Sequence, residues 1–143
     1  MIKWMVDRLA IFLAKSHTEV GEYILGLFSL LWGIWLLLPV WNTFSINMFS
    51  AFLHVAPEEI WGLAAVSLGV ITIFSAAIKD LPMRKTSTFI NIIFWLFISF
   101  MFLLATPKTT AIPIYAMLAL QSFWRYVKLT FYMNLEKRFT QED

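Results

Sequence analysis

Four long apolar stretches restrict the fold of this sequence more than any other feature. They run from about residue 22 to 38, 60 to 78, 88 to 105 and 111 to 131. A helix needs about 20 mostly apolar residues to cross the hydrocarbon core of a bilayer, and each stretch is close to that length. The sequence therefore predicts a single-domain, all-α membrane protein, a bundle of four transmembrane helices.

Composition agrees with this prediction. Hydrophobic residues make up 60% of the chain and charged residues only 14%, against about 25% charged residues in soluble domains. A soluble fold of this size leaves much of its surface in water and cannot bury so much apolar area. The chain has no cysteine, which excludes disulfides and cysteine-ligated metals, and a net charge of +2 does not indicate a nucleic-acid partner.

Helix-breaking and capping residues fall between the predicted spans. Pro39 follows the first span, the segment 79–82 ends in proline after the second, and Pro107 follows the third. Ser16 and Glu19 form a capping-box pattern before the first span. These signals place the breaks where the hydropathy requires them.

Basic residues predict the orientation of the spans. With a cytoplasmic N-terminus, Lys108 is alone on the outer side, and an even number of spans returns the C-terminus to the cytoplasm. Such a bias predicts that both termini are cytoplasmic. The ten basic residues on the inner side are Lys3, Arg8, Lys15, Lys79, Arg84, Lys85, Arg125, Lys128, Lys137 and Arg138.

Three segments flank the spans. Residues 1–17 are amphipathic and predict a short helix in the inner membrane interface. Residues 44–56 predict a helix at the outer side, either interfacial or re-entrant, and we favour the interfacial form. Residues 132–143 are polar and charged and predict a cytoplasmic tail.

The sequence offers little for catalysis or metal binding. His17 and His54 lie on opposite sides of the bilayer in this topology and cannot share a metal. Glu58 and Glu59 follow Pro57 and suit the start of a helix, where carboxylates meet the positive end of the dipole. Adjacent helical residues point about 100° apart, which makes these two a poor acid–base pair. We therefore expect no enzymatic activity, no cofactor and no metal.

Charged residues inside a span indicate function or a specific partner. Arg125 comes after about 13 apolar residues of the fourth span, roughly 20 Å of helix, which is short of the roughly 30 Å hydrocarbon core. Arg125 and Lys128 can extend to the headgroups. Alternatively, Arg125 pairs with Glu22 or Glu19 at the start of the first span, or binds a lipid phosphate.

Two amides fall in the inner half of the predicted bundle. Asn91 lies one turn into the third span and Gln121 one turn before Arg125. A hydrogen bond between these amides would join two neighbouring helices. The alternative is that they line a polar pore, but two amides do not make a continuous hydrophilic stripe.

Small residues predict close helix contacts in the first two spans. Ser29 with Gly33, and Ala65 with Gly69, have the small-xxx-small spacing that lets helix backbones approach. Such faces can join the first two spans of one chain, or one subunit to another. The residues concerned are Gly26, Ser29 and Gly33 in the first span and Gly62, Ala65 and Gly69 in the second.

Three strings carry a resemblance to a known class of proteins. LLWGIWLLLPVWNTFS (residues 30–45), APEEIWG (residues 56–62) and PIYAMLALQSFWRYVKL (residues 113–129) are similar to segments of small four-span membrane proteins of phage and prophage genomes. The resemblance rests on tryptophan, proline and glycine placement in apolar helices. It implies a bacterial inner membrane and a phage-related setting, and it transfers no functional residue.

A chain with little soluble mass and no chemical site is expected to act by assembly in contact with membrane lipids. The leading hypothesis is a non-enzymatic membrane protein that forms a homo-oligomer or joins a larger membrane complex. The alternatives are a holin-like pore former and a small-ion channel.

Overall fold

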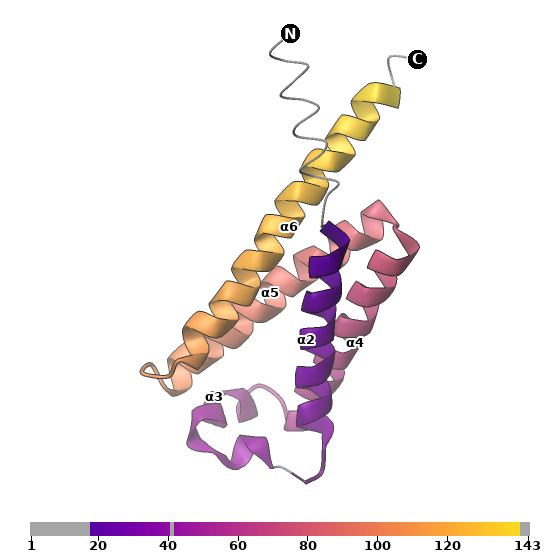
Figure 1. Ribbon diagram of the computed structural model, residues 1–143. Helices are drawn as coiled ribbons and strands as arrows, with labels where there is room; N and C mark the ends of the chain where they lie inside the picture. Colours follow the sequence, from indigo (N-terminus) through magenta and orange to yellow (C-terminus); the bar gives the residue numbers. More distant parts are fainter. Residues whose placement is uncertain (1–17, 41, 141–143) are drawn as a thin grey trace.

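The computed structural model describes residues 18–40 and 42–140, and every regular element in these ranges is a helix. The expected all-helical fold is confirmed. Figure 1 shows four long helices and a group of short turns between the first two. The elements are α2 (Thr18–Leu37), η1 (Thr43–Ser45), η2 (Asn47–Phe49), α3 (Ser50–Leu53), α4 (Glu58–Ile78), α5 (Leu81–Ala105) and α6 (Ala111–Thr140).

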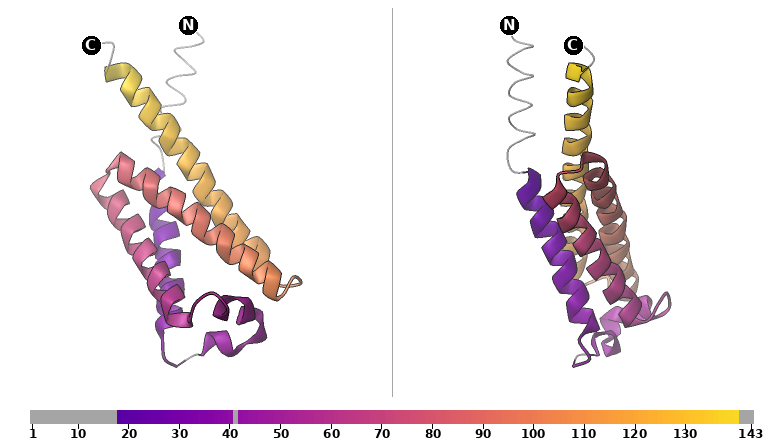
Figure 2. Two further views of the ribbon diagram at one scale, coloured as in Figure 1. Left: turned by 180° about the vertical axis from the view of Figure 1, so that it is seen from behind. Right: turned by 90° about the vertical axis from the view of Figure 1, so that its right-hand side faces the viewer.

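The long helices form two antiparallel pairs. Helix α2 packs along α4, and α5 packs along α6, with a tight turn at Lys79 and Asp80 between the pairs. The axis of α5 is inclined to those of α2 and α4, so the two pairs separate toward one end (Figures 1 and 2). The short segment 43–53 lies at that end.

Three of the long helices are long and apolar enough to cross a membrane. The qualifying stretches are Glu19–Leu37, Glu58–Ile78 and Leu81–Ala105, with mean hydropathies of 1.7, 2.0 and 2.3. Helix α6 has 30 residues, about 45 Å at 1.5 Å per residue, but Gln121, Arg125 and Lys128 interrupt its apolar sequence. The fourth span therefore stays a prediction.

Several helix bounds differ from the sequence-based ones. Helix α5 begins at Leu81 rather than at residue 88 because the Asp80 carboxylate accepts a hydrogen bond from the Met83 N–H at 3.2 Å and Pro82 suits the first turn. Helix α6 continues through most of the expected tail, to Thr140. The predicted helix over residues 1–17, the cap at Ser16 and residues 141–143 lie outside the described residues.

The segment between α2 and α4 is a series of short turns, not the single helix predicted for residues 44–56. Glu58 explains part of this shape. Its two carboxylate oxygens accept hydrogen bonds from the backbone N–H groups of Thr43 and Phe44, both at 3.2 Å. The first residue of α4 thus fixes the start of the segment.

Aromatic side chains fill the space where the two pairs separate. Phe52 is fully buried and contacts Phe102 of α5 and Trp61 of α4, with ring centroids 5.0 and 5.5 Å apart. Phe44 and Phe49 stack on each other at 5.1 Å. We call this the aromatic end of the bundle; it comprises residues 43–61 and 97–115.

The opposite end carries most of the charged side chains that the structure describes. It comprises residues 18–29 at the start of α2, residues 72–91 around the α4–α5 turn, and residues 121–134 of α6. We call it the charged end. Both figures show α6 continuing past the α4–α5 turn at this end.

Candidate functional site

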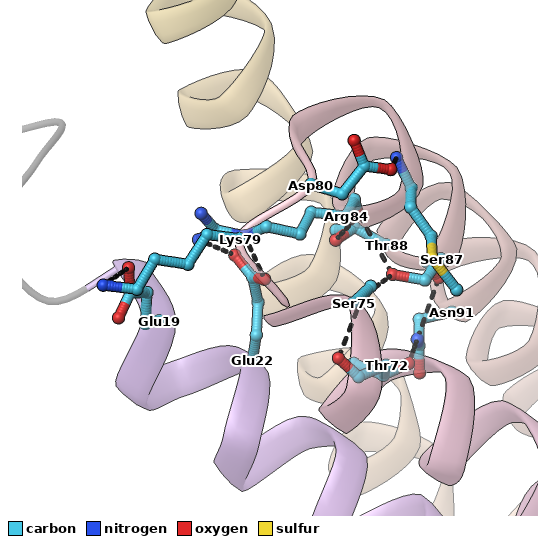
Figure 3. A network of polar contacts seen from close by, with 11 residues as sticks. Glu19, Glu22, Thr72, Ser75, Lys79, Asp80, Arg84, Ser87, Thr88 and Asn91 are labelled. Atoms are coloured by element: carbon cyan, nitrogen blue, oxygen red, sulfur yellow. Dashed lines mark hydrogen bonds and ion pairs between the residues drawn. The ribbon is translucent and has the colours of Figure 1, made fainter. Parts of the chain in front are cut away.

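A buried ion pair joins α2 to α5 at the charged end. Arg84 Nε donates to one carboxylate oxygen of Glu22 and Arg84 Nη2 to the other, both at 2.8 Å. The side chain of Glu22 is 0% exposed and that of Arg84 is 7% exposed. This two-pronged geometry is the strongest form of the guanidinium–carboxylate contact. Figure 3 shows Glu22 and Arg84 facing each other, with dashed lines for their contacts.

The turn before α5 sets the position of Arg84. Lys79 ends α4 in the left-handed conformation, with φ 57°, and Asp80 caps the next helix. The backbone N–H of Arg84 donates to the Asp80 carbonyl at 2.9 Å. Arg84 is therefore held in the first turn of α5 and lies in the packed interface with α2.

Beyond this pair, hydroxyl groups connect α5 to α4. The Ser75 and Ser87 hydroxyls are 3.1 Å apart, and Ser87 and Thr88 each donate to the Arg84 carbonyl, at 3.0 and 2.7 Å. Ser75 donates in turn to the Thr72 carbonyl at 2.9 Å. All of these side chains are buried.

Asn91 of α5 forms hydrogen bonds with both α2 and α4, at the end of this polar network that is farther from the α4–α5 turn. Its amide nitrogen donates to Thr72 Oγ1 of α4 at 2.8 Å and to the Ser87 carbonyl at 2.9 Å. Its amide oxygen accepts from Ser29 Oγ of α2 at 3.4 Å. The predicted hydrogen bond between Asn91 and Gln121 is absent from the described residues, because the amide of Asn91 bonds to α2 and α4 instead.

Arg125 approaches the same site from α6. Its guanidinium lies against Gly21, where a Cβ atom would collide with it. It is within electrostatic reach of both Glu22 and Arg84. Arg84 holds both oxygens of Glu22, and the predicted pairing of Arg125 with Glu22 stays a prediction. The alternative partner, Glu19, forms an ion pair with Lys79, in which Glu19 Oε1 lies 3.6 Å from Lys79 Nζ.

Lys128 lies about one helical turn after Arg125 on α6. Its ammonium is 5.6 Å from the ring centroid of Trp124, within the range of a cation–π contact. Lys85 makes the equivalent contact with Tyr126 at 5.3 Å. These aromatic–lysine pairs border the network but do not belong to it.

The small residues pack α2 against α4 within one chain. A Cβ on Gly33 would lie 2.6 Å from the Val66 nitrogen and 2.7 Å from the Gly62 carbonyl oxygen, and one on Gly69 would lie 2.6 Å from the Gly26 carbonyl oxygen. The glycines therefore face each other as two pairs, 26 with 69 and 33 with 62. Ala65, between Gly62 and Gly69, is fully buried.

Aromatic contacts continue the packing toward the aromatic end. Trp32 Nε1 donates to the Tyr115 hydroxyl at 2.9 Å, which joins α2 to α6. Trp95 is fully buried and stacks on Tyr115 with centroids 5.5 Å apart. His54 is exposed at this end, and His17 lies outside the described residues.

The contacts of the described polar side chains suit helix packing. Within residues 18–40 and 42–140 no three histidine, cysteine, aspartate or glutamate side chains gather as a metal site would require. The buried carboxylate is held by a guanidinium, and the hydroxyls and the Asn91 amide bond mainly to one another and to backbone carbonyls. These contacts fix the relative positions of α2, α4 and α5.

Sequence reasoning missed Arg84 as the partner of Glu22 because Arg84 was assigned to the inner loop. A signal was present. Arg84, Ser87, Thr88 and Asn91 recur at i, i+3, i+4 and i+7, which places four polar side chains on one face of α5. Such a stripe at the start of a span indicates a buried polar interface.

Comparison of the chain with protein-family models, with curated proteins and with solved structures finds no match.

Proposed function

We propose that this chain is a non-enzymatic four-span membrane protein with its charged end in the cytoplasm. It acts by assembly, either with further copies of itself or with another membrane protein. The bacterial inner membrane and the phage-related setting implied by the sequence resemblance are part of this proposal.

The case for a fourth span rests on how α6 accommodates its charges. The guanidinium of Arg125 reaches Gly21 in the first turn of α2, at the charged end. Lys128 lies one turn further along α6, toward the same end. An apolar stretch ahead of Arg125, with Ile114, Met117 and Leu120 exposed, then remains to cross the bilayer. Long basic side chains commonly extend to the headgroups in this way.

The observation that carries the assembly proposal is the inward direction of the polar side chains. Glu22, Thr72 and Asn91 are each 0% exposed, whereas Leu63 of α4, Phe100 of α5 and Leu120 of α6 are each more than half exposed. Polar groups that bond within one subunit cannot line a lumen shared between subunits. An apolar outer surface suits lipid and neighbouring apolar helices, since helix association in membranes depends on packing.

Native mass spectrometry of the protein in nanodiscs tests this proposal. A defined homo-oligomer, or a complex with a second membrane protein retained from the host membrane, is the expected result. A companion assay measures the entry of a small dye into cells after induction. Rapid dye entry that persists in the Asn91→Leu variant would overturn the proposal in favour of a holin-like pore. A defined ion conductance abolished by Gln121→Leu would instead favour a channel.

A further inference from the structure

The segment between α2 and α4 exposes aliphatic side chains at the aromatic end. Val40 is 73% exposed, Ile46 53%, Leu53 51% and Val55 57%. They lie outside the three apolar stretches that qualify as membrane-spanning helices. Large aliphatic groups at such exposure are unfavourable in water, so the surroundings of this segment need an explanation.

The segment is firmly attached to the bundle by its other side chains. Phe44, Phe49 and Phe52 are buried, and Phe49 and Phe52 both pack against Phe102 of α5. The Glu58 carboxylate holds the backbone of the first turn, η1. The exposed aliphatic groups are therefore presented by a fixed scaffold.

The charge pattern identifies what covers these groups. No aspartate, glutamate, lysine or arginine occurs between Tyr23 and Glu58, so the exposed polar residues described in the segment are serines, asparagines and His54. Exposed apolar side chains also flank the segment, with Leu38 at the end of α2 and Ile60 in the first turn of α4, and the exposed Glu59 stands beside Ile60. A mixed apolar and uncharged polar surface beside the ends of two spans fits the boundary between lipid headgroups and acyl chains.

We infer that Val40 and residues 42–56 form a membrane-interface element whose exposed aliphatic side chains contact the acyl chains of the outer leaflet. Ser45, Asn47 and Ser50 meet the headgroup layer. This inference rests on the proposed four-span placement in the bilayer. The element is interfacial and not re-entrant, because Glu58 fixes its start at the level of the first turn of α4. A re-entrant segment would also need protein partners for its backbone groups at membrane depth.

Site-directed spin labelling tests the inference directly, because the natural chain has no cysteine. Single cysteines are placed at Ile46, Leu53, Ser50 and Lys108, and at Leu63 as a lipid-facing control on α4. Each labelled protein is reconstituted in phospholipid nanodiscs. Power saturation then compares collision of the nitroxide with oxygen, which concentrates in lipid, and with a water-soluble nickel chelate.

The expected result is that the ratio of oxygen to nickel accessibility at Ile46 and Leu53 approaches that at Leu63. Ser50 should give a severalfold lower ratio, near that of Lys108. If Ile46 and Leu53 resemble Lys108 while Leu63 remains lipid-like, the inference fails and the four-span proposal stands. If neither reagent reaches Ile46 and Leu53, a protein surface covers them and the lipid assignment is overturned. A water-like Leu63 would contradict the four-span proposal itself.

Discussion

The charged end and the aromatic end of this bundle hold their helices together by different kinds of contact. At the charged end the buried ion pair of Glu22 with Arg84 and the buried amide of Asn91 are central links between α2, α4 and α5. At the aromatic end, rings such as Phe52 and Phe102 share contacts with several neighbours. The first region concentrates its stabilisation in a few directional contacts, and the second distributes it.

This difference predicts different responses to mutation. A buried charge that loses its partner has no alternative inside the bundle, so the cost falls on a single contact. A ring that loses one neighbour keeps the others. The charged end should therefore be sensitive to single substitutions, and the aromatic end more tolerant of them.

The largest effect is expected from breaking the ion pair. Glu22→Leu leaves the Arg84 guanidinium buried without its carboxylate and should lower the free energy of unfolding by about 3 to 5 kcal/mol. The measurement is unfolding in mixed detergent micelles followed by tryptophan fluorescence. The double variant Glu22→Leu/Arg84→Met should recover most of the loss, because it removes both charges.

Glu19→Gln is the matched control for that experiment. Glu19 and Lys79 form an ion pair at 3.6 Å with side chains 42% and 69% exposed, and exposed pairs contribute about 0 to 1 kcal/mol. An equal loss in Glu19→Gln and Glu22→Leu would show that burial of the pair is not what matters.

The glycine contacts between α2 and α4 should give the next largest effect. In Gly33→Ala the new Cβ would lie within 3 Å of backbone atoms of Val66 and Gly62, so the helices must move apart, at a cost of about 1 to 3 kcal/mol. Gly21→Ala is the control, because the three heavy atoms nearest to its Cβ all belong to the guanidinium of Arg125 and none to the backbone. In the same unfolding assay, Gly21→Ala should lose less free energy of unfolding than Gly33→Ala. The reverse order would contradict the close contact of α2 with α4 at Gly33.

Asn91→Leu should have a moderate effect, about 0.6 to 2 kcal/mol. The loss is limited because Thr72 and Ser29 keep hydrogen bonds to the Leu68 and Leu25 carbonyls. Gln121→Leu removes a comparable amide from α6 and should leave the free energy of unfolding unchanged. If the two variants are equally destabilised, Asn91 and Gln121 act together, and the claim that Asn91 acts without Gln121 is wrong.

The smallest effect is expected at the hydrogen bond between Trp32 and Tyr115. Tyr115→Phe removes the acceptor but keeps the ring that stacks on Trp95 and Phe102, and should cost about 0.5 to 1.5 kcal/mol. Trp32→Phe and the double variant complete a cycle that measures the coupling between the two residues. If Tyr115→Phe lowers the free energy of unfolding as much as Glu22→Leu does, the two ends do not differ in their sensitivity to single substitutions.

The sequence by itself determined the helical class, the approximate positions of the long helices and the breaks between them. Long apolar runs, Pro39 and the turn at Asp80 and Pro82 are local signals, and hydropathy and backbone geometry act on neighbouring residues. The small residues of the first two spans were also visible as a face that favours close packing. The sequence left two alternatives for this face, packing within one chain or packing between subunits. The structure uses it within one chain, with Gly33 against Gly62.

Only the tertiary structure decided the partners. Arg84 and Arg125 both have the charge to pair with Glu22, and Thr72 and Gln121 both have groups to bond with Asn91. The choice depends on which helices are neighbours and on the depth that each side chain reaches. Side chains of α5 reach α2, where Arg84 bonds to Glu22 and Asn91 to Ser29. Contacts of this kind join residues 62 positions apart in the chain, and no local pattern specifies which distant helix face will lie opposite.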